Sequence, residues 1–372
     1  MTDAAATGAE SLLNRLRRLT EIESPSRDVG GAREMAVLLA QWWTDAGARV
    51  RLVESDAGPH LVAEVDGAGD PLLLVGHTDT VWPQGTLEGE VPWGVDGDVV
   101  RGPGVYDMKS GLVAMIAAVE RLRGRPRRAV RAVLVCDEEI GSPLSQDLMR
   151  ECAAGVAGAI GFESPHPDGA MKVGRRGSTR LRLQVRGRAA HAALDPDAGI
   201  SAIDELVDQL MVIRSIIADP ALDSEVLCNV GTIDGGGRAN VVPAEAAAEI
   251  GLRFLDGATE ERVLGALRAL RPMRAGAVVE TTVLSHRPAW SPSAADQRLL
   301  ARVADAGARI GQVVAGRPAD GAGDANLLGS LGIPTIDGFG PRGGGAHAVG
   351  EHALLSSLTA RIELLEAVLA DV

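Results

Sequence analysis

Helical and strand-like patterns of apolar residues alternate in the first part of the sequence. Apolar side chains recur at helical spacing in residues 12–22 and again in residues 35–43, which predicts two amphipathic helices. Short apolar runs then predict strands at 51–53, 61–65, 72–75, 130–135 and 159–162, and a longer run predicts a helix at 111–122. Alternation of this kind predicts an α/β layer with a mostly parallel, buried central sheet.

The pattern changes near residue 174. Residues 178–187, STRLRLQVRG, alternate between apolar and polar side chains, which is typical of a half-exposed antiparallel strand. Further strands are expected at 226–233, 246–254 and 277–284, helices at 200–217, 260–270, 297–310 and 356–369, and a short strand at 333–336. We therefore expect a domain formed by residues 1–175 and 285–372, interrupted by a smaller α+β domain, residues 176–284, with an antiparallel sheet and two helices.

Length, charge and cysteine content narrow the function classes. The 372 residues suffice for two domains, and the net charge of −13 argues against nucleic acid or an anionic membrane as a partner. The three cysteines lie far apart without CxxC spacing, so neither a disulfide framework nor a thiolate zinc site is predicted. Residues 1–19 lack the run of roughly 7–15 apolar residues that a secretory signal needs, and we expect a cytoplasmic protein.

Histidine and acidic residues directly follow several predicted strands. His77 and Asp79 follow the strand in PLLLVGHTDTV, Glu138 and Glu139 follow the strand in AVLVCDEEIGS, and Glu163 follows the strand in AIGFESP. Open α/β sheets bind ligands at the carboxyl ends of their strands. Each residue also has an ordinary interpretation, as a surface histidine or as part of a solvated acidic turn.

Two glycine-containing loops carry further candidates. The segment RGPGVYDMKSGL places Asp107 just before a helix, where Asp107 or Ser110 would also serve as an ordinary helix cap. A phosphate-binding loop is excluded here because the third glycine of GxGxxG and the Walker lysine are both missing. The segment GFGPRGGGAHAVGEH places His347 in a loop too rich in glycine to be held by its own packing.

Taken together, these residues predict a two-metal hydrolytic site. Imidazole and carboxylate ligands without thiolate suit Zn²⁺, Mn²⁺ or Co²⁺, and a bridging Asp is the usual device for holding two ions about 3.5–4 Å apart. The sequence supplies five candidate ligands, with Glu138 remaining as the base; the ligands are His77, Asp107, Glu139, Glu163 and His347. The chain has only three Phe, five Trp and one Tyr, and we expect Trp82, Tyr106, Phe162 and Phe339, which lie close to these ligands in sequence, to wall the metal cleft.

The motifs GHTDTV, GPGVYDMKSG, CDEEIGS, GFE and GAH resemble, in order and spacing, a dinuclear zinc family. That family includes glutamate carboxypeptidase, acetylornithine deacetylase, succinyl-diaminopimelate desuccinylase and aminoacylase, and the resemblance runs essentially from end to end. The stretches HTDTVWPQGTL, GRAAHAALDPDAGISAI and NVVPAEAAAEIGLRF look most like the glutamate carboxypeptidase branch.

The resemblance implies a role for each candidate residue of the first domain. Two zinc ions per subunit, replaceable by Co²⁺ or Mn²⁺, would be bound by His77 with Glu163 and by Glu139 with His347, and Asp107 would bridge them. Asp79 would hold the second ring nitrogen of His77. Glu138 would be the general base, taking a proton from the metal-bound bridging water and returning it to the leaving amine.

The resemblance also assigns roles to the inserted domain. It would act as a lid and dimerisation domain, and His191 would donate to the carbonyl oxygen, in the active site of the partner subunit of a homodimer. Arg253 and Asn240 resemble the family's binders of the free α-carboxylate of the substrate, although Arg253 has an ordinary salt bridge as its alternative. Ala193, where the carboxypeptidase branch tends to carry glycine, and the loop GGGAHA depart from that branch next to the substrate.

The expected activity is zinc-dependent cleavage of the amide bond between an acyl or peptidyl group and a C-terminal amino acid, such as glutamate. The alternative enzyme is an N-acyl-amino-acid deacylase or desuccinylase, which needs the same metals and a different pocket. An inactive relative acting as a binding or regulatory protein would have lost a ligand or the base, whereas this chain retains all of them.

Overall fold

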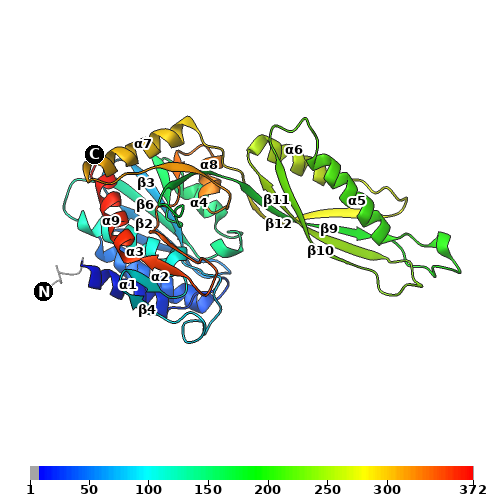
Figure 1. Ribbon diagram of the computed structural model, residues 1–372, viewed down its shortest axis with the longest axis horizontal. Coiled ribbons are helices and arrows are strands. Elements are labelled where there is room, and N and C mark those ends of the chain that lie inside the picture. Colours follow the sequence, from blue (N-terminus) through cyan, green and yellow to red (C-terminus); the bar gives the residue numbers. More distant parts are fainter. Residues whose placement is uncertain (1–7, 372) are drawn as a thin grey trace. The chain divides into compact units, whose positions relative to one another are not determined.

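A mixed sheet forms the centre of the first of two compact units, which comprises the chain up to Gly174, Pro292–Ala319 and the chain from Gly323 (Figure 1). The computed structural model describes residues 8–371, so the first seven residues of the segment inspected for a secretory signal lie outside the described part. Within that part the strand order is β1-β2-β6-β3-β7-β14. The strands are β1 (Arg49–Val53), β2 (His60–Val65), β3 (Ala68–His77), β6 (Arg128–Val135), β7 (Gly158–Gly161) and β14 (Thr335–Ile336). Strands β6, β3, β7 and β14 run parallel, so their carboxyl ends meet at one edge of the sheet.

Helices cover both faces of this sheet, which explains why the second half of its central strand β3 is apolar and buried without alternation. On β3, Leu72 and Leu74 belong to the core that includes residues of α1, α2, α3, α7 and α9, whereas Leu73 and Val75 pack with residues of α4 and α8. The helices are α1 (Ala9–Glu21), α2 (Val29–Asp45), α3 (Ser110–Arg121), α4 (Gln146–Cys152), α7 (Ala294–Arg309), α8 (Ala325–Ser330) and α9 (Leu355–Leu369). Among the described residues, no helix is both long and apolar enough to cross a membrane.

Several short strands of the first unit were not expected from the sequence. Strands β4 (Gly94–Asp96), β5 (Val99–Arg101), β15 (Gly343–Gly344) and β16 (His352–Leu354) form a small sheet in the order β15-β16-β5-β4, and β8 (Met171–Arg175) pairs with β13 (Gly316–Ala319). The small sheet joins the glycine-rich loop that contains His347 to the segment that precedes Asp107.

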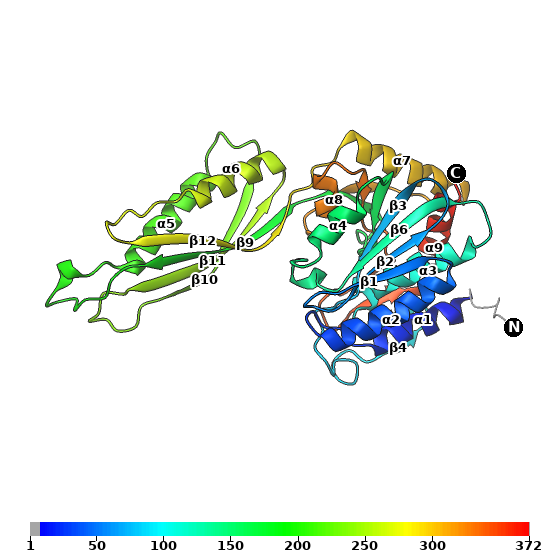
Figure 2. The ribbon, with the colours of Figure 1, turned by 180° about the vertical axis from the view of Figure 1, so that it is seen from behind.

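The second unit, Arg175–Ser291 with Asp320–Ala322, is an antiparallel sheet with two helices (Figure 2). Its strands are β9 (Gly177–Arg186), β10 (Val226–Gly235), β11 (Glu245–Phe254) and β12 (Val278–Arg287), in the order β10-β11-β9-β12, and its helices are α5 (Ala202–Ile217) and α6 (Gly257–Arg268). Alternate residues of β9, among them Leu181 and Leu183, share one core with residues of both helices, and the residues between them are exposed. The expected combination of an α/β unit with a mostly parallel sheet and an antiparallel α+β unit is confirmed.

Candidate metal centre

His77 ends strand β3 at the carboxyl edge of the central sheet, and its side chain is only 1% exposed. Its Nδ1 donates a hydrogen bond to the main-chain carbonyl oxygen of Asp79, at 2.9 Å. In the neutral ring this leaves the lone pair on Nε2, which lies 3.2 Å from Asp107 Oδ1 and 3.3 Å from Glu163 Oε1. A lone pair aimed at two carboxylates is the arrangement expected of a metal ligand.

His347 forms the second half of the centre. It lies in the loop between β15 and β16, where its backbone has the left-handed φ of 61° that is unusual for a residue other than glycine. Its Nε2 lies 3.3 Å from Asp107 Oδ2 and 3.2 Å from Glu139 Oε2. Unlike the His77 side chain, the His347 side chain is 51% exposed, so this half of the centre opens to solvent.

Asp107 lies between the two histidines and turns one carboxylate oxygen toward each. It belongs to the helical turn Val105–Lys109 that precedes α3, and the Asp107–Met108 peptide bond is cis. Two ligand atoms on one tetrahedral zinc ion stand about 3.4 Å apart, because each bond is about 2.0–2.1 Å long. The four nitrogen–oxygen separations of 3.2–3.3 Å around His77 and His347 match that spacing.

A buried acceptor gives a further test of this fit. Glu139 Oε1 is inaccessible to solvent and has no hydrogen-bond partner among the described residues, which is costly for a carboxylate oxygen unless a cation faces it. The donor set of imidazoles and carboxylates suits Zn²⁺, Mn²⁺ or Co²⁺. The side chains therefore fit the binding of divalent cations.

The pKa values show how strongly the charges at the centre interact. Burial acts to lower the pKa of His77, but hydrogen bonds with Asp107, Asp79 and Glu163 raise it well above its ordinary value. Hydrogen bonds with Asp107 and Glu139 raise the pKa of His347 to about 10. Burial raises the pKa of Glu139 despite its contact with His347. Carboxylates at this density require positive charge among them, which protonated histidines or divalent cations provide.

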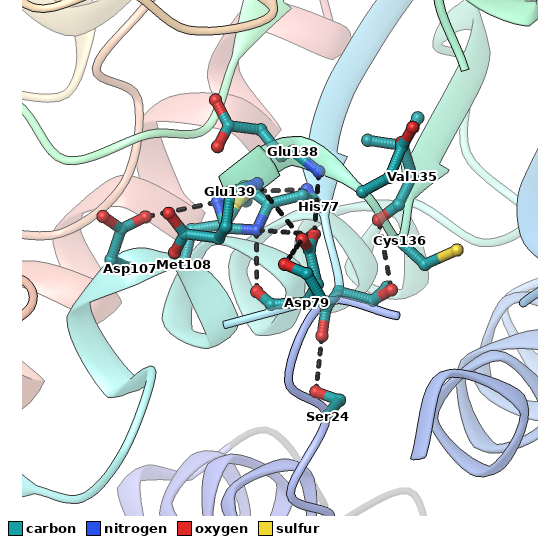
Figure 3. A network of polar contacts seen from close by, with 12 residues as sticks. Ser24, His77, Asp79, Asp107, Met108, Val135, Cys136, Glu138 and Glu139 are labelled. Carbon is teal, nitrogen blue, oxygen red and sulfur yellow. Dashed lines mark hydrogen bonds and ion pairs between the residues drawn. The ribbon is translucent and has the colours of Figure 1, made fainter. Parts of the chain in front are cut away.

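Asp79 contacts His77 in a different way from the one expected. Its carboxylate Oδ1 is 3.4 Å from His77 Nδ1, farther away than its own carbonyl oxygen. The carboxylate instead accepts hydrogen bonds from the main-chain N–H groups of Glu138 and Glu139, both at 3.1 Å, and from Ser26 Oγ at 2.6 Å (Figure 3). Asp79 thus fixes the turn that carries the two glutamates as well as the ring of His77.

Glu138 follows β6 and is 7% exposed. Its carboxylate points away from the hydrogen bond that its own N–H donates to Asp79 (Figure 3). An oxygen of Glu138 lies within 4.8 Å of ligand atoms of His77 and Glu163. The structure therefore brings together all seven candidate residues of the first unit: His77, Asp79, Asp107, Glu138, Glu139, Glu163 and His347.

The three candidates of the second unit are exposed and do not form one cluster within it. His191 lies beside Asn240, because the backbone N–H of the next residue, Ala192, donates to Asn240 O at 3.0 Å. Arg253 lies near the far end of β11, where its Nη1 donates to Ser178 Oγ. Strand β11 separates Glu245 from Arg253 by eight residues, or about 27 Å at a rise of about 3.4 Å per residue.

Sequence reasoning missed one residue near the centre and misplaced two rings. Glu351, which is 1% exposed, accepts hydrogen bonds from the segment around Asp107, and only its position four residues after His347 could have drawn attention to it. Phe162 and Phe339 pack against each other with ring centroids 5.2 Å apart and are 1% and 0% exposed. The expectation that these two rings wall the cleft is wrong, because both lie in the apolar core beneath it.

Comparison with known proteins agrees with the sequence motifs. Residues 73–371 match a family model described as peptidase family M20/M25/M40. Carboxypeptidase G2 of Pseudomonas sp. (strain RS-16) is 26% identical over 99% of this chain and 91% of its own length. Succinyl-diaminopimelate desuccinylase of Methylorubrum populi is 31% identical over 91% of this chain and 92% of its own length.

Solved structures show the same fold at lower identity. A tripeptidase of Staphylococcus aureus aligns with a TM-score of 0.75 at 19% identity, over 98% of this chain and 99% of that one. A metallo-carboxypeptidase of Sulfolobus solfataricus aligns with a TM-score of 0.73 at 17% identity, over 96% of this chain and 98% of that one.

Proposed function

The chain belongs to peptidase family M20/M25/M40 and is a metal-dependent hydrolase; from this premise we propose that it cleaves the amide bond between an acyl or peptidyl group and a C-terminal amino acid, with two zinc ions per subunit. The placement of Asp107 carries the proposal, since each of its two oxygens faces a different histidine. We place His77 and Glu163 on one ion, Glu139 and His347 on the other, and Asp107 on both.

Glu138 is the general base in this proposal. A pair of bound divalent ions would lower the pKa of a water molecule and polarise the substrate carbonyl. Glu138 takes the proton of the attacking water and passes it to the leaving amine, so one carboxylate serves both proton transfers. Asp79 supports this role because its carboxylate holds the backbone N–H of Glu138.

His191 suits the role of hydrogen-bond donor to the carbonyl oxygen. Its Nδ1 accepts hydrogen bonds from the N–H groups of Ala193 and Leu194, at 3.2 and 3.1 Å. An acceptor at Nδ1 places the ring proton on Nε2, which is the group that would donate to a developing oxyanion. These contacts support the assigned role better than the interpretation as an ordinary surface histidine does.

Arg253 and Asn240 would bind the free α-carboxylate of the substrate. The guanidinium group of Arg253 donates to Ser178 Oγ and Leu252 O, and no carboxylate forms an ion pair with it in the described part of the chain, which suits a substrate anion. Arg253 lies near the end of strand β11, whereas Asn240 precedes its first residue, Glu245, which is about 27 Å from Arg253 along the strand. One chain therefore cannot bind the same carboxylate with both residues. We propose a homodimer through the second unit, in which Asn240 and His191 act in the partner's active site.

The relatives define the alternative within the same chemistry. A desuccinylase and a carboxypeptidase both match over nearly the whole chain, so an N-acyl-amino-acid deacylase is the second candidate. Both would act on small molecules in the cytoplasm and would accept Co²⁺ or Mn²⁺ in place of Zn²⁺.

A hydrolysis assay tests the proposed function. Purified protein loaded with Zn²⁺ is incubated with acetyl, succinyl, benzoyl and dipeptidyl derivatives of several amino acids, and the released amine is measured. We expect cleavage that chelation abolishes and Zn²⁺ restores, with glutamate derivatives as the first substrates to compare. Cleavage that persists after complete chelation would contradict the proposed chemistry.

A mixing experiment tests the dimer. Glu138→Ala and His191→Ala are each expected to be inactive, and a dimer of one chain of each has one intact site if His191 acts across subunits. Random exchange then restores about a quarter of wild-type activity, because half of the dimers are mixed and each has one working site. If mixing restores no activity while exchange is verified by mass, His191 acts within its own chain.

A further inference from the structure

Glu351 is a buried carboxylate that the proposed mechanism does not use. It lies between His347 and β16 and is 1% exposed. A charged group is buried this completely only where hydrogen bonds satisfy it.

Each oxygen of Glu351 accepts two hydrogen bonds. Oε1 accepts from the backbone N–H groups of Tyr106 and Asp107, at 2.9 and 3.1 Å. Oε2 accepts from the backbone N–H of Gly104 at 3.0 Å and from Trp82 Nε1 at 2.6 Å. Three of the four donors belong to the turn that carries the bridging ligand, including the N–H of Asp107 itself.

The backbone of Glu351 is tied to the loop of His347. Its N–H donates to Ala348 O at 2.8 Å, and the N–H of Ala348 donates to Gly345 O at 2.9 Å. Gly345 has a φ of 73°, and an added Cβ there would come within 2.7 Å of Gly350, so the loop closes tightly on itself. The position of Glu351 thereby restrains the position of His347, whose side chain is half exposed and has little packing of its own.

The charge of Glu351 has a buried complement in Lys109, which is 1% exposed. The Lys109 ammonium donates to Ile22 O at 3.1 Å. Burial lowers the pKa of Lys109 to about 8, and the charge of Glu351 opposes that shift. The negative charges of Glu351 and Glu23 thus both favour the charged form of Lys109.

We propose that Glu351 is a positioning residue for metal binding, which ties the His347 loop to the Asp107 turn and so sets the spacing of these two ligands. The proposal rests on the proposed function, because it takes Asp107 and His347 to share a metal ion. The central sheet fixes His77, Glu139 and Glu163 at the ends of its strands, but His347 lies outside that sheet. The hydrogen bonds of Glu351 hold the His347 loop in place where the central sheet does not.

Glu351→Gln is the first test, with Glu205→Gln as its matched control. A glutamine at position 351 would place its amide –NH₂ against two N–H donors in either orientation. Glu205 is also fully buried, and each of its oxygens also accepts two hydrogen bonds, from Gln209, Met273 and Arg274 of the second unit. Both variants lose a similar buried carboxylate, but only Glu351 contacts a segment that carries a metal ligand.

The readout is Zn²⁺ affinity, measured by competition with a fluorescent chelator, together with metal content after dialysis. We expect Glu351→Gln to bind one of its two zinc ions about 10–100-fold more weakly, as is usual when a residue that orients a ligand is lost. Glu205→Gln should bind both ions like the wild type, even if its melting temperature falls. Unchanged affinity for both ions in folded Glu351→Gln overturns the proposal, and so does an equal loss in Glu205→Gln.

If Glu351→Gln does not fold, Trp82→Phe tests the role of Glu351 instead. It removes one donor to Oε2 and keeps the carboxylate, so a smaller loss of affinity at the same ion is expected, and wild-type affinity overturns the proposal. None of these measurements needs a substrate. A wild-type protein that binds two ions and hydrolyses nothing would end the proposed function and leave the test of Glu351 intact.

Discussion

The candidate metal-site residues at the central sheet of the first unit and the candidate substrate residues of the second unit differ in how deeply they are buried. His77, Asp79 and Glu139 have side chains that are at most 7% exposed, and their backbone or side-chain atoms are fixed by hydrogen bonds within one chain. His191, Asn240 and Arg253 are exposed.

This difference follows from the two kinds of sheet. A parallel sheet covered on both faces gathers strand ends at one edge, where side chains meet without help from another molecule. An antiparallel sheet with helices on one face leaves its other face to solvent. The first unit therefore brings its candidate metal ligands together within one chain, whereas the candidate residues of the second unit remain exposed.

Glu138→Gln tests the first side of this comparison and has the largest expected effect. Removal of a general base lowers kcat by about 10²–10⁴-fold, while the zinc content should stay at the wild-type value. Glu280→Gln, which changes a surface carboxylate of the second unit, should keep wild-type kcat. Retained activity in Glu138→Gln would mean that another group accepts the proton.

Metal removal should affect the two units unequally. Because the proposed ions would bind only the folded first unit, one zinc ion at 100 times its dissociation constant should stabilise that unit by about 2.7 kcal/mol. Hydrogen exchange after chelation should therefore quicken in the Asp107 turn and in the loop around His347. Exchange in strands β9 to β12 serves as the internal control, and equal acceleration there would show that the units do not respond separately.

The sequence predicted the grouping of the candidate residues in the first unit better than the positions of those in the second unit. The candidates His77, Glu139 and Glu163 could be predicted to lie close together because each follows a buried strand, and parallel strands bring their carboxyl ends to one edge of the sheet. Glu351 could not be found this way, because nothing in GEH indicates that its carboxylate is buried. Asn240 and Arg253 belong to one sequence motif, which suggests that they lie close together. Strand β11 instead separates them, and its length and direction cannot be read from the motif.

Arg253→Lys tests the second side of the comparison. Lysine keeps the charge and loses the two parallel donors of the guanidinium group, so KM should rise about 10–100-fold for substrates with a free α-carboxylate, as expected for the loss of about 1.5–3 kcal/mol. Arg186→Lys, at a surface ion pair with Glu280, should leave KM unchanged. A substrate with an amidated carboxyl group should not distinguish Arg253→Lys from the wild type; if it does, Arg253 acts elsewhere.

The smallest effect is expected at Asp256, which caps α6 in the second unit and has no part in the proposed chemistry. Its Oδ1 accepts from the N–H of Thr259 at 2.8 Å, and Oδ2 accepts from Ser224 Oγ. Loss of such a cap in Asp256→Ala should cost about 1 kcal/mol of unfolding free energy, measured in urea at pH 7. Zinc affinity should not change, since this residue stabilises only the unit that carries none of the proposed metal ligands.

The pH dependence of this cap separates its charge from its hydrogen bonds. Burial alone would raise the pKa of Asp256, but the hydrogen bonds from Ser224 and Thr259 lower it below its ordinary value of 3.8. A lowered pKa in the folded state means that the charged cap stabilises above pH 3.8 and that this contribution disappears as the pH falls through the folded-state value. Asp256→Asn keeps an acceptor that does not titrate, so the difference in stability between the wild type and Asp256→Asn should shrink as the pH is lowered from 6 toward 3. A difference that stays constant over that range would show that the carboxylate charge contributes nothing, and that the second unit relies on hydrogen-bond geometry where the first relies on charge.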